Sequence, residues 1–327
     1  MTVLVTGVAG FIGYHVAHAL IGRGETVVGI DNLNDYYDVG LKEARLARLD
    51  GRPGFFSFRR IDIADRDAIS ALLAEESRID RVVHLAAQAG VRYSLVNPYA
   101  YLRSNIDGQV VLLEAARRLP RLLHFVYASS SSVYGGNREM PFSTTDRTDH
   151  PVSLYGATKK AMEVISDSYA AMYSLPLTAL RLFTVYGPWG RPDMAYFIFG
   201  RKILAGEPIP VFNHGDMRRD FTYIDDVVAG VINCLDRPPP GVGRGGCHRI
   251  YNLGNNRPER LLDFIAALEL ALGRKAVIEL LPMQPGDVKE TYADIEASRR
   301  DLDFDPKTSI REGIPRFVAW FRERYGS

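Results

Sequence analysis

Short runs of β-branched and aromatic residues alternate with stretches of helical hydrophobic periodicity through the first half of the chain. The apolar runs lie at residues 3–5, 26–30, 55–58, 82–85, 123–127 and 177–182. The helical pattern is found at residues 14–23, 66–76, 106–118 and 155–172. Alternation of strands and helices is typical of βαβ units, so the pattern predicts a parallel sheet with helices on both faces.

The alternation ends after about residue 185, where aromatic, Gly and Pro residues become dense. Residues 250–253 (IYNL) have the composition of a strand and are expected to return to the sheet. We therefore predict an α/β fold, a Rossmann-type doubly wound parallel sheet with a smaller α/β C-terminal substrate lobe. The expected division assigns residues 1–184 and roughly 223–256 to a nucleotide-binding domain, and residues 185–222 and 257–327 to the lobe.

Composition argues against several classes of protein. The chain has 327 residues, of which 46% are hydrophobic and 24% charged, and a net charge of +1 without a basic tract, which gives little support to nucleic-acid or membrane-surface binding. The N-terminus lacks a signal peptide, and no segment has the ~20 apolar residues of a membrane helix. Cys234 and Cys247 form no metal or redox motif. These features predict a cytoplasmic protein without a metal site.

Residues 6–13 (TGVAGFIG) follow the first predicted strand and open a helix. Gly7, Gly10 and Gly13 allow the backbone to turn tightly and approach a pyrophosphate, which the N–H groups and dipole of the helix N-terminus attract. Asp31 ends the second strand, where a carboxylate accepts hydrogen bonds from ribose hydroxyls and repels a 2′-phosphate. Residues 32–34 supply no arginine for such a phosphate, so the sequence favours NAD over NADP.

A second glycine-rich run, GVGRGG at residues 241–246, matches the same spacing literally. It follows three prolines at residues 238–240 rather than a strand, and a strand-like run rather than a helix comes after it. We predict a surface loop there, because the strand and helix around the glycines, and not the spacing alone, indicate a dinucleotide site.

Residues 155–159 (YGATK) open a helix, with Ser153 as the expected N-cap. Tyr155 and Lys159 are four residues apart and share one helical face. An ammonium and a cationic nicotinamide ring both favour the phenolate, and lowering the tyrosine pKa from ~10 to ~7 needs roughly 4 kcal/mol. Such a tyrosine could accept a proton from a hydroxyl whose carbon gives up a hydride. Because this spacing also occurs on ordinary helices, it becomes informative only together with the dinucleotide loop.

Several segments together resemble those of the extended short-chain dehydrogenases/reductases, and among them the NAD-dependent nucleotide-sugar epimerases. They are TGVAGFIG (6–13), Asp31, HLAAQAGV (84–91), YASSSSVYGG (127–136), YGATK (155–159) and RLFTVYGPWGR (181–191). The resemblance implies a catalytic trio of Ser130, Tyr155 and Lys159, in which the serine hydroxyl bonds to the sugar 4-oxygen and the tyrosine. It also implies NAD as the cofactor, bound by Gly7, Gly10, Phe11, Ile12, Gly13, Asp31, Asn32, Asn34, Asp62, Ile63, Leu85, Ala86, Ala87, Gln88, Asn105, Ala128, Ser129, Tyr155, Lys159, Phe183 and Val185.

The serines after the catalytic position are informative by what they replace. Ser131 and Ser132 occupy the positions at which related sugar dehydratases carry an Asp-Glu pair. Ser132 also occupies the position at which related UDP-glucuronate decarboxylases carry a Glu. A hydroxyl of high pKa cannot serve as the general acid or base of those reactions. The sequence therefore disfavours both dehydration and decarboxylation.

The segment 181–197 resembles that of UDP-glucuronate 4-epimerases, as do residues 31–38 and 88–94. Thr184 replaces the Asn of UDP-glucose 4-epimerases, and the planar cation of Arg191 suits bidentate binding of a carboxylate. The resemblance further implies that residues 210–212 bind uracil by their backbone, Arg219 the diphosphate and Asp287 the ribose; Gln284 stands where neutral-sugar epimerases carry an Arg. The implied substrate-binding set is Arg92, Ser130, Ser131, Ser132, Thr184, Arg191, Val211, Phe212, Arg219, Gln284 and Asp287.

The resemblance implies reversible 4-epimerisation of UDP-glucuronate to UDP-galacturonate through a 4-keto sugar, with Arg191 and Thr184 holding the carboxylate against loss of carbon dioxide. Three alternatives stay open: a UDP-glucuronate decarboxylase, a neutral or N-acetylated UDP-hexose 4-epimerase, and a non-catalytic NAD-binding sensor. The resemblance also implies a homodimer, joined by a four-helix bundle of helices at about residues 100–118 and 153–173. Apolar residues that fit a buried face there are Val110, Leu113, Ala161 and Ile165.

Overall fold

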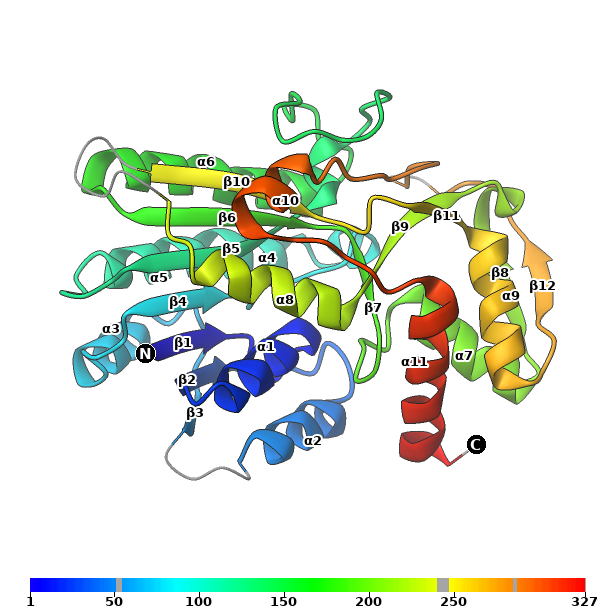
Figure 1. Ribbon diagram of the computed structural model, residues 1–327, viewed down its shortest axis with the longest axis horizontal. Coiled ribbons are helices and arrows are strands. Elements are labelled where there is room, and N and C mark those ends of the chain that lie inside the picture. Colours follow the sequence, from blue (N-terminus) through cyan, green and yellow to red (C-terminus); the bar gives the residue numbers. More distant parts are fainter. Residues whose placement is uncertain (51–54, 240–246, 285–286, 327) are drawn as a thin grey trace.

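The computed structural model describes residues 1–50, 55–239, 247–284 and 287–326, and its largest element is a seven-stranded parallel sheet (Figure 1). The strands follow the order β10-β6-β5-β4-β1-β2-β3. Their bounds are β1 (Thr2–Thr6), β2 (Thr26–Asp31), β3 (Phe56–Arg60), β4 (Arg81–His84), β5 (His124–Ser130), β6 (Pro176–Leu182) and β10 (Cys247–Leu253). The order reverses between β1 and β4, which is the switch point of a doubly wound sheet and confirms the predicted fold class.

Helices cover both faces of this sheet (Figure 1). One face carries α1 (Phe11–Gly22), α2 (Val39–Leu49) and α8 (Ile224–Leu235), and the other carries α3 (Arg66–Glu75), α5 (Gly108–Ala116) and α6 (Leu154–Tyr173). Residues 3–5 of the central strand β1 are completely buried. A strand covered on both faces needs apolar side chains at successive positions, and this explains why the strands read as continuous apolar runs.

The predicted strands and helices are present, with ends that differ by a few residues. The prediction that residues 250–253 return to the sheet is confirmed, because β10 pairs in parallel with β6 over Cys247–Leu253. The helix predicted at residues 106–118 is different: the chain first forms the short helix α4 (Pro98–Tyr101) and a π-helical turn η2 (Leu102–Asp107) before α5. This turn directs Asn105 inward, where its side chain bonds to both backbone groups of Gln88 and to Thr158.

The C-terminal elements form a second layer beside the carboxyl ends of the large sheet (Figure 1). They comprise a three-stranded sheet of β7 (Thr184–Tyr186), β9 (Arg218–Tyr223) and β11 (Pro258–Arg260), a two-stranded sheet of β8 (Pro208–Val211) and β12 (Val277–Leu280), and the helices α7 (Ala195–Ala205), α9 (Leu261–Leu272) and α11 (Ile310–Tyr325). Helix α10 (Glu296–Leu302) packs against β10 and α8. The chain therefore crosses back to the large sheet before α11, and the division into two domains stays a prediction.

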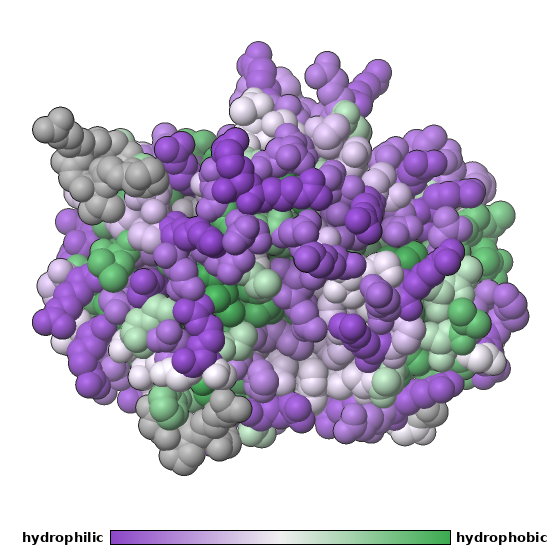
Figure 2. Space-filling view, viewed as in Figure 1, coloured by the Kyte–Doolittle hydropathy of each residue, from purple (hydrophilic) through white to green (hydrophobic). Residues whose placement is uncertain are grey.

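The surface seen in Figure 2 is largely hydrophilic, with hydrophobic residues gathered over β12 and α9 at its right. Leu270, Val277, Ile278 and Leu280 are exposed large apolar residues of these two elements. No helix in the described part of the chain has the length and apolar character needed to cross a membrane. The GVGRGG run at residues 241–246 lies outside the described residues, so the loop predicted for it is untested.

Candidate active site

A large pocket lies at the carboxyl edge of the parallel sheet, where the segments that follow β1, β2, β4, β5 and β6 converge. Strand ends meet there because parallel strands all point the same way, and the C-terminal layer closes the opposite side. The pocket brings together most of the predicted residues: Gly7, Gly10, Phe11, Ile12, Gly13, Asp31, Asn32, Asn34, Ile63, Leu85, Ala86, Ala87, Gln88, Ala128, Ser129, Ser130, Ser131, Ser132, Tyr155, Lys159, Phe183, Thr184, Val185, Arg191, Arg219 and Asp287.

Six predicted residues are not among those that line the pocket: Asp62, Arg92, Asn105, Val211, Phe212 and Gln284. Asn105 is completely buried behind the wall, where it holds Gln88. Asp62 accepts a hydrogen bond from Asn32, which does line the pocket. Asn105 and Asp62 thus act, in this structure, on pocket residues and not at the pocket itself.

The other residues outside the lining lie in or against the C-terminal layer. The guanidinium of Arg92 sits 5.0 Å from the ring centroid of Phe212, across the boundary between the layers. Val211 is completely buried, and its carbonyl accepts a hydrogen bond from the N–H of Leu281. The side-chain oxygen of Gln284 is buried without a hydrogen-bond partner. Val211 also pairs with Leu280 in the β8–β12 ladder, so its predicted role in binding uracil would have to use the second lone pair of this carbonyl.

The glycine loop has the close backbone approaches that its sequence predicts. Gly7 has φ +69°, and a Cβ atom there would lie 2.7 Å from the backbone nitrogen of Ala86. A Cβ atom on Gly13 would lie 2.1 Å from the carbonyl oxygen of Gly7. Helix α1 begins at Phe11, and its N-cap Gly10 has no side chain to bond to the first-turn N–H groups. These groups face the pocket as donors, so the loop fits the pyrophosphate of a dinucleotide.

Asp31 lies at the end of β2, on the pocket wall beside this loop. Its carboxylate accepts hydrogen bonds from the N–H groups of Ala9 and Leu33, at 3.2 and 2.9 Å. Burial raises the pKa of Asp31, although these bonds and the charge of Lys42 oppose the rise. Each oxygen retains a lone pair for a ribose hydroxyl, and an anionic 2′-phosphate would meet a carboxylate here.

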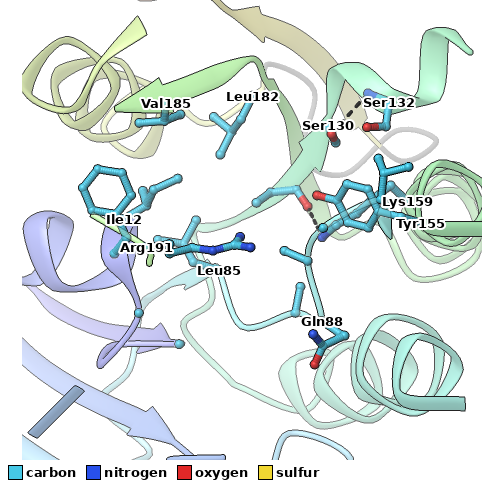
Figure 3. A pocket seen from close by; sticks show the side chains of 18 of the residues that line it. Ile12, Leu85, Gln88, Ser130, Ser132, Tyr155, Lys159, Leu182, Val185 and Arg191 are labelled. Atoms are coloured by element: carbon cyan, nitrogen blue, oxygen red, sulfur yellow. Dashed lines mark hydrogen bonds between the residues drawn. The ribbon is translucent and has the colours of Figure 1, made fainter. Parts of the chain in front are cut away.

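The predicted catalytic trio is assembled by β5 and α6 (Figure 3). Ser130 ends β5, while Tyr155 and Lys159 project from the first turns of α6. Ser153 caps this helix as predicted, because its hydroxyl accepts the N–H of Gly156 at 3.0 Å. The Lys159 ammonium donates to the carbonyl of Ala128 at 2.8 Å, which ties the helix to the strand. Three groups from two elements thus meet at one wall of the pocket.

The electrostatics of the trio differ from the expectation that Lys159 lowers the tyrosine pKa. Burial raises the pKa of Tyr155, opposed by a hydrogen bond with Ser130 and by the charge of Arg191. Burial also lowers the pKa of Lys159 to about 7, opposed by the charge of Glu163. Desolvation outweighs the attraction between neighbouring groups because the wall is dry. The surroundings of Tyr155 in the protein alone therefore favour the neutral phenol, and a positive charge brought into the pocket would favour the phenolate.

The serine run divides into residues with different partners. The hydroxyl of Ser130 accepts the N–H of Ser132 at 3.2 Å, and the chain then turns through the helix η3 (Ser131–Tyr134). Ser131 and Ser132 both line the pocket, without a carboxylate at either position. Ser129 instead donates to Glu163 at 2.6 Å. Ser129 is 2% exposed and supports the wall through this bond.

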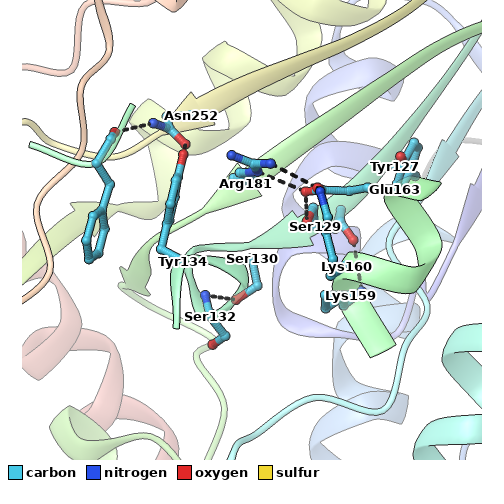
Figure 4. A network of polar contacts seen from close by, with 12 residues as sticks. Tyr127, Ser129, Ser130, Ser132, Tyr134, Lys159, Lys160, Glu163, Arg181 and Asn252 are labelled. Atoms are coloured by element: carbon cyan, nitrogen blue, oxygen red, sulfur yellow. Dashed lines mark hydrogen bonds and ion pairs between the residues drawn. The ribbon is translucent and has the colours of Figure 1, made fainter. Parts of the chain in front are cut away.

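A buried ion pair beneath the trio was not predicted from the sequence (Figure 4). Arg181 on β6 donates through Nε and Nη2 to the two oxygens of Glu163 on α6, both at 2.9 Å. The side chains of both residues are 2% exposed. The Arg181 guanidinium also lies 4.8 Å from the Tyr134 ring, and the Tyr134 hydroxyl donates to Asn252 at 2.6 Å. The network joins β5, β6, β10 and α6 behind Ser130 and Lys159.

Two further residues that the sequence analysis missed surround Arg191. Arg191 enters the pocket from the side opposite Tyr155 and Lys159 (Figure 3). Its Nε and Nη2 atoms donate to the carboxylate of Asp193 at 3.0 and 2.5 Å, and Tyr36 donates to the same carboxylate at 3.1 Å. The R-x-D spacing at residues 191–193 was the available signal for Asp193, but nothing in the sequence links Tyr36 to it.

A second pair of opposite charges lies where the C-terminal layer borders the pocket. Arg219 on β9 donates to Asp287 at 2.7 Å and to the carbonyls of Arg218 and Lys289. Burial lowers the pKa of Arg219, opposed by the charge and hydrogen bond of Asp287. Both residues line the pocket, as the prediction of a diphosphate arginine and a ribose acid requires. In the described part of the chain, no group of three or more His, Cys, Asp or Glu side chains is arranged to hold a metal ion.

Comparison with known proteins agrees with this geometry. The chain is 49% identical over 335 residues to UDP-glucuronate 4-epimerase 4 of Arabidopsis thaliana, covering 99% of this chain and 76% of the relative. It superimposes with a TM-score of 0.91 on the crystal structure of UDP-glucuronic acid 4-epimerase from Bacillus cereus in complex with UDP-glucuronic acid and NAD, at 35% identity and with 99% and 100% of the two chains covered.

A more distant comparison shows how general the architecture is. The UDP-glucose 4-epimerase of Thermotoga maritima, solved with UDP-glucose, superimposes with a TM-score of 0.84 at 30% identity, with 99% of each chain covered. The profile of the family described as "NAD dependent epimerase/dehydratase family" matches residues 3–254, which hold the glycine loop and the trio. The chain belongs to the NAD dependent epimerase/dehydratase family.

Proposed function

We propose that this protein interconverts UDP-glucuronate and UDP-galacturonate by NAD-dependent 4-epimerisation. The observation that carries the proposal is the position of Arg191, a cation on the pocket wall opposite Tyr155, with Ser131 and Ser132 in place of acids. A guanidinium across from the base can bind the C6 carboxylate of a uronate while the 4-hydroxyl reaches the tyrosine. Relatives described as UDP-glucuronate 4-epimerases support the same substrate.

The residues of the trio perform the proton chemistry. NAD, which the glycine loop and Asp31 would hold, would supply a reversible hydride acceptor for C4 of the sugar and the positive charge of its nicotinamide. Tyr155 accepts the proton of the 4-hydroxyl, and Ser130 donates a hydrogen bond to the same sugar oxygen. Lys159, whose pKa is lowered to about 7 by burial, can take up or release a proton near neutral pH and so can buffer the phenol. No external redox partner is consumed.

The pocket residues also have to hold the intermediate. A 4-keto uronate is a β-keto acid: its C5–C6 bond can break, leaving its electron pair in the C4–C5 enolate and releasing carbon dioxide. Arg191 and Thr184 oppose this step, because a carboxylate paired with a cation loses that attraction when it becomes neutral carbon dioxide. The absence of an acid at positions 131 and 132 disfavours protonation of the enolate. The epimerase is therefore favoured over the decarboxylase.

The proposal is tested by incubating the purified holoprotein with UDP-glucuronate. Proton NMR should show UDP-galacturonate accumulating to an equilibrium mixture, with no net change in NAD and no release of carbon dioxide. UDP-glucose and UDP-N-acetylglucosamine, assayed in parallel, should turn over far more slowly. Equal turnover of the neutral sugars would favour the neutral-sugar epimerase, and the formation of UDP-xylose would favour the decarboxylase.

Replacing Arg191 with alanine should weaken binding of UDP-glucuronate about 100-fold, because a bidentate, charge-assisted contact in a dry pocket contributes roughly 3 kcal/mol. Carbon dioxide should also appear among the products. Arg191→Lys is the matched control, since it keeps the charge but loses the fork, and its effect should be smaller. Calorimetric affinities and trapped carbon dioxide measure both effects; unchanged affinity and product would remove Arg191 from the uronate site.

We further propose a homodimer joined through η1 (Arg92–Leu95), α4, α5 and α6. Large apolar side chains of this region are exposed: Leu95, Val96, Tyr99, Leu102, Val164 and Met172. They replace part of the predicted face, because Leu113 is completely buried in the core of the chain itself. Sedimentation velocity should give twice the chain mass at micromolar concentration, whereas a monomer would exclude the dimer.

Two coarser features complete the proposal. The boundaries at residues 184, 223 and 256 are proposed to separate the NAD-binding domain from the UDP-sugar lobe, since the parallel sheet contains β6 and β10 while β7, β8, β9, β11 and β12 form other sheets. A cytoplasmic location is proposed from the sequence, and cell fractionation checks it.

A further inference from the structure

The carboxylate of Asp193 uses one edge of the Arg191 guanidinium. It accepts from Nε at 3.0 Å and from Nη2 at 2.5 Å, in the two-pronged geometry that a carboxylate and a guanidinium prefer. These bonds leave Nη1 and the second hydrogen of Nη2 unused, and this remaining end of the fork is also suited to a carboxylate. Arg191 lines the pocket and Asp193 does not, so the ion pair stands behind the surface that a sugar would contact.

Tyr36 holds Asp193 from another part of the chain. The Tyr36 hydroxyl donates to Asp193 Oδ2 at 3.1 Å, and the Tyr36 ring contacts that of Tyr93, with the ring centroids 4.7 Å apart and the planes tilted by 51°. Burial and the charge of Asp193 raise the pKa of Tyr36 to about 12, which keeps the phenol a donor. Tyr36 follows Asp31, the residue proposed for the adenosine ribose, by five positions. The cofactor side of the pocket is thereby connected to the cation on the sugar side.

The backbone of Gly90 completes this cluster. A Cβ atom on Gly90 would lie 3.1 Å from the Tyr36 hydroxyl, 3.7 Å from Asp193 Oδ2 and 3.8 Å from Arg191 Nη2. Gly90 has φ +104°, and its carbonyl accepts the Tyr101 hydroxyl. The backbone of Gly90 thus lies close to all three polar groups, and the Arg191 side chain is 20% exposed.

We propose that Asp193, held by Tyr36, is a positioning residue that aims the free end of Arg191 at the uronate carboxylate and so determines how often the 4-keto sugar is retained and not decarboxylated. This inference rests on the proposed function. It assigns roles to two residues that do not touch the reacting atoms: Asp193 orients Arg191, and Tyr36 orients Asp193. It also implies that the substrate carboxylate shares Arg191 with a second anion.

Asp193 and the substrate carboxylate would share the charge of Arg191, and this determines what replacement of Asp193 should do. Without the charge of Asp193, Arg191 attracts the substrate carboxylate more strongly, so affinity is kept or increased. Its guanidinium gains freedom, however, and a misplaced contact lowers the rate of a step that depends on orientation. A carboxylate held loosely also allows the C5–C6 bond to align with the ketone, break, and pass its electron pair to the C4–C5 enolate as carbon dioxide leaves.

The experiment compares the wild-type holoenzyme with Asp193→Asn, Tyr36→Phe and Arg191→Ala, using UDP-glucuronate. For Asp193→Asn we expect kcat for UDP-galacturonate formation to fall about tenfold, KM to stay within twofold or decrease, and carbon dioxide, which the wild type is not expected to release, to appear as a measurable share of turnover. Tyr36→Phe keeps both charges and removes one hydrogen bond, so its changes should be smaller and in the same direction. Arg191→Ala should instead raise KM.

Every other pattern overturns the inference. A raised KM with unchanged kcat would make Asp193 a substrate-affinity residue, and equal losses in melting temperature and in all kinetic constants would make it merely structural. If Asp193→Asn does not fold, Tyr36→Phe decides by the same criteria. Turnover of the wild type distinguishes failure of the proposed function from failure of the positioning role. If the wild type forms no UDP-galacturonate, both proposals fail. If the wild type turns over normally and the variants behave like it, only the positioning role is removed.

Discussion

Replacing Tyr155 with phenylalanine should reduce kcat for epimerisation by roughly 10³-fold, within the range for loss of a general acid–base group. The substitution removes only the hydroxyl, while the ring remains in a wall where Tyr155 packs edge-on against Tyr101 at 6.0 Å. The hydroxyls of the nearby tyrosines Tyr36 and Tyr101 are already donated to Asp193 and to the carbonyl of Gly90. Steady-state assays by NMR or coupled chromatography measure the loss.

The matched control for this experiment is Tyr169→Phe on the same helix. Tyr169 lies outside the pocket and donates to Glu114 at 2.8 Å, so its loss should leave kcat within about twofold, as for substitutions away from a site. Calorimetry should find that Tyr155→Phe still binds UDP-glucuronate, because the glycine loop and Arg191 are intact. Turnover of Tyr155→Phe within tenfold of wild type would contradict the assignment of the base.

Replacing Arg181 with methionine should lower the free energy of unfolding by about 3 kcal/mol, because it leaves the buried carboxylate of Glu163 without its main partner. This loss of stability is at the lower end of the range expected for a broken buried ion pair, because the ammonium of Lys160 remains 3.6 Å from Glu163. Equilibrium urea unfolding, followed by fluorescence, measures it. Activity should decrease as well, because Glu163 supports Ser129 and lies one helical turn after Lys159.

The double variant Arg181→Met/Glu163→Met distinguishes the effect of the ion pair on stability from the effect of packing at the same site. Apolar side chains of similar volume need no partner, so the double variant should recover most of the stability that Arg181→Met loses. A double variant as unstable as the single one would show that packing, and not the uncompensated charge, causes the loss. The free energy of unfolding of the conservative variant Arg181→Lys should lie between those of wild type and Arg181→Met, since lysine keeps the charge but cannot make the two-pronged contact of a guanidinium.

The stability difference should also depend on pH. Burial would raise the pKa of Glu163, but the hydrogen bonds and charge of Arg181 hold it below the ordinary value of 4.5. A carboxylate with a lowered folded-state pKa contributes stability that is full above its ordinary pKa and is lost as the pH falls through the folded value. In Arg181→Met, burial without that partner should raise the pKa of Glu163, so the difference in stability should be largest above this raised pKa and shrink as the pH falls from it towards the lowered wild-type pKa.

The local features of this protein were readable in its sequence because each depends on neighbouring residues. The β-branched runs predicted every strand of the parallel sheet, and the glycines of residues 6–13 predicted the loop, since a positive φ at Gly7 and a close backbone approach at Gly13 exclude larger side chains. Ser153 was recognisable as a helix cap from its position before YGATK. The π-helical turn at η2 was not, because its cause is the contact of Asn105 with a distant segment.

The residues of the site also fall into those that could be located from the sequence and those that only the structure revealed. Resemblance located Ser130, Tyr155, Lys159 and Arg191, and the pocket contains all four. In the protein alone, burial raises the tyrosine pKa, an effect that only packing determines; the predicted lowering included the charge of a bound nicotinamide and stays a prediction. Glu163 was overlooked although it follows Lys159 by one turn, and Arg181 although it is the one charge in an apolar strand. Neither residue signals a partner until β6 and α6 are placed against each other.

The sequence alone determined the strand-helix order, the nucleotide loop and the preference for NAD, since these follow from periodicity, backbone freedom and side-chain identity along a short stretch of chain. The roles of residues 130, 155, 159 and 191 were implied by resemblance to the family. Tertiary structure decided which charges share a site: Arg181 with Glu163, Arg219 with Asp287, and Arg191 with Asp193 and Tyr36. Charge pairing and desolvation act through space, and Tyr36 and Asp193 are 157 residues apart until folding brings them together.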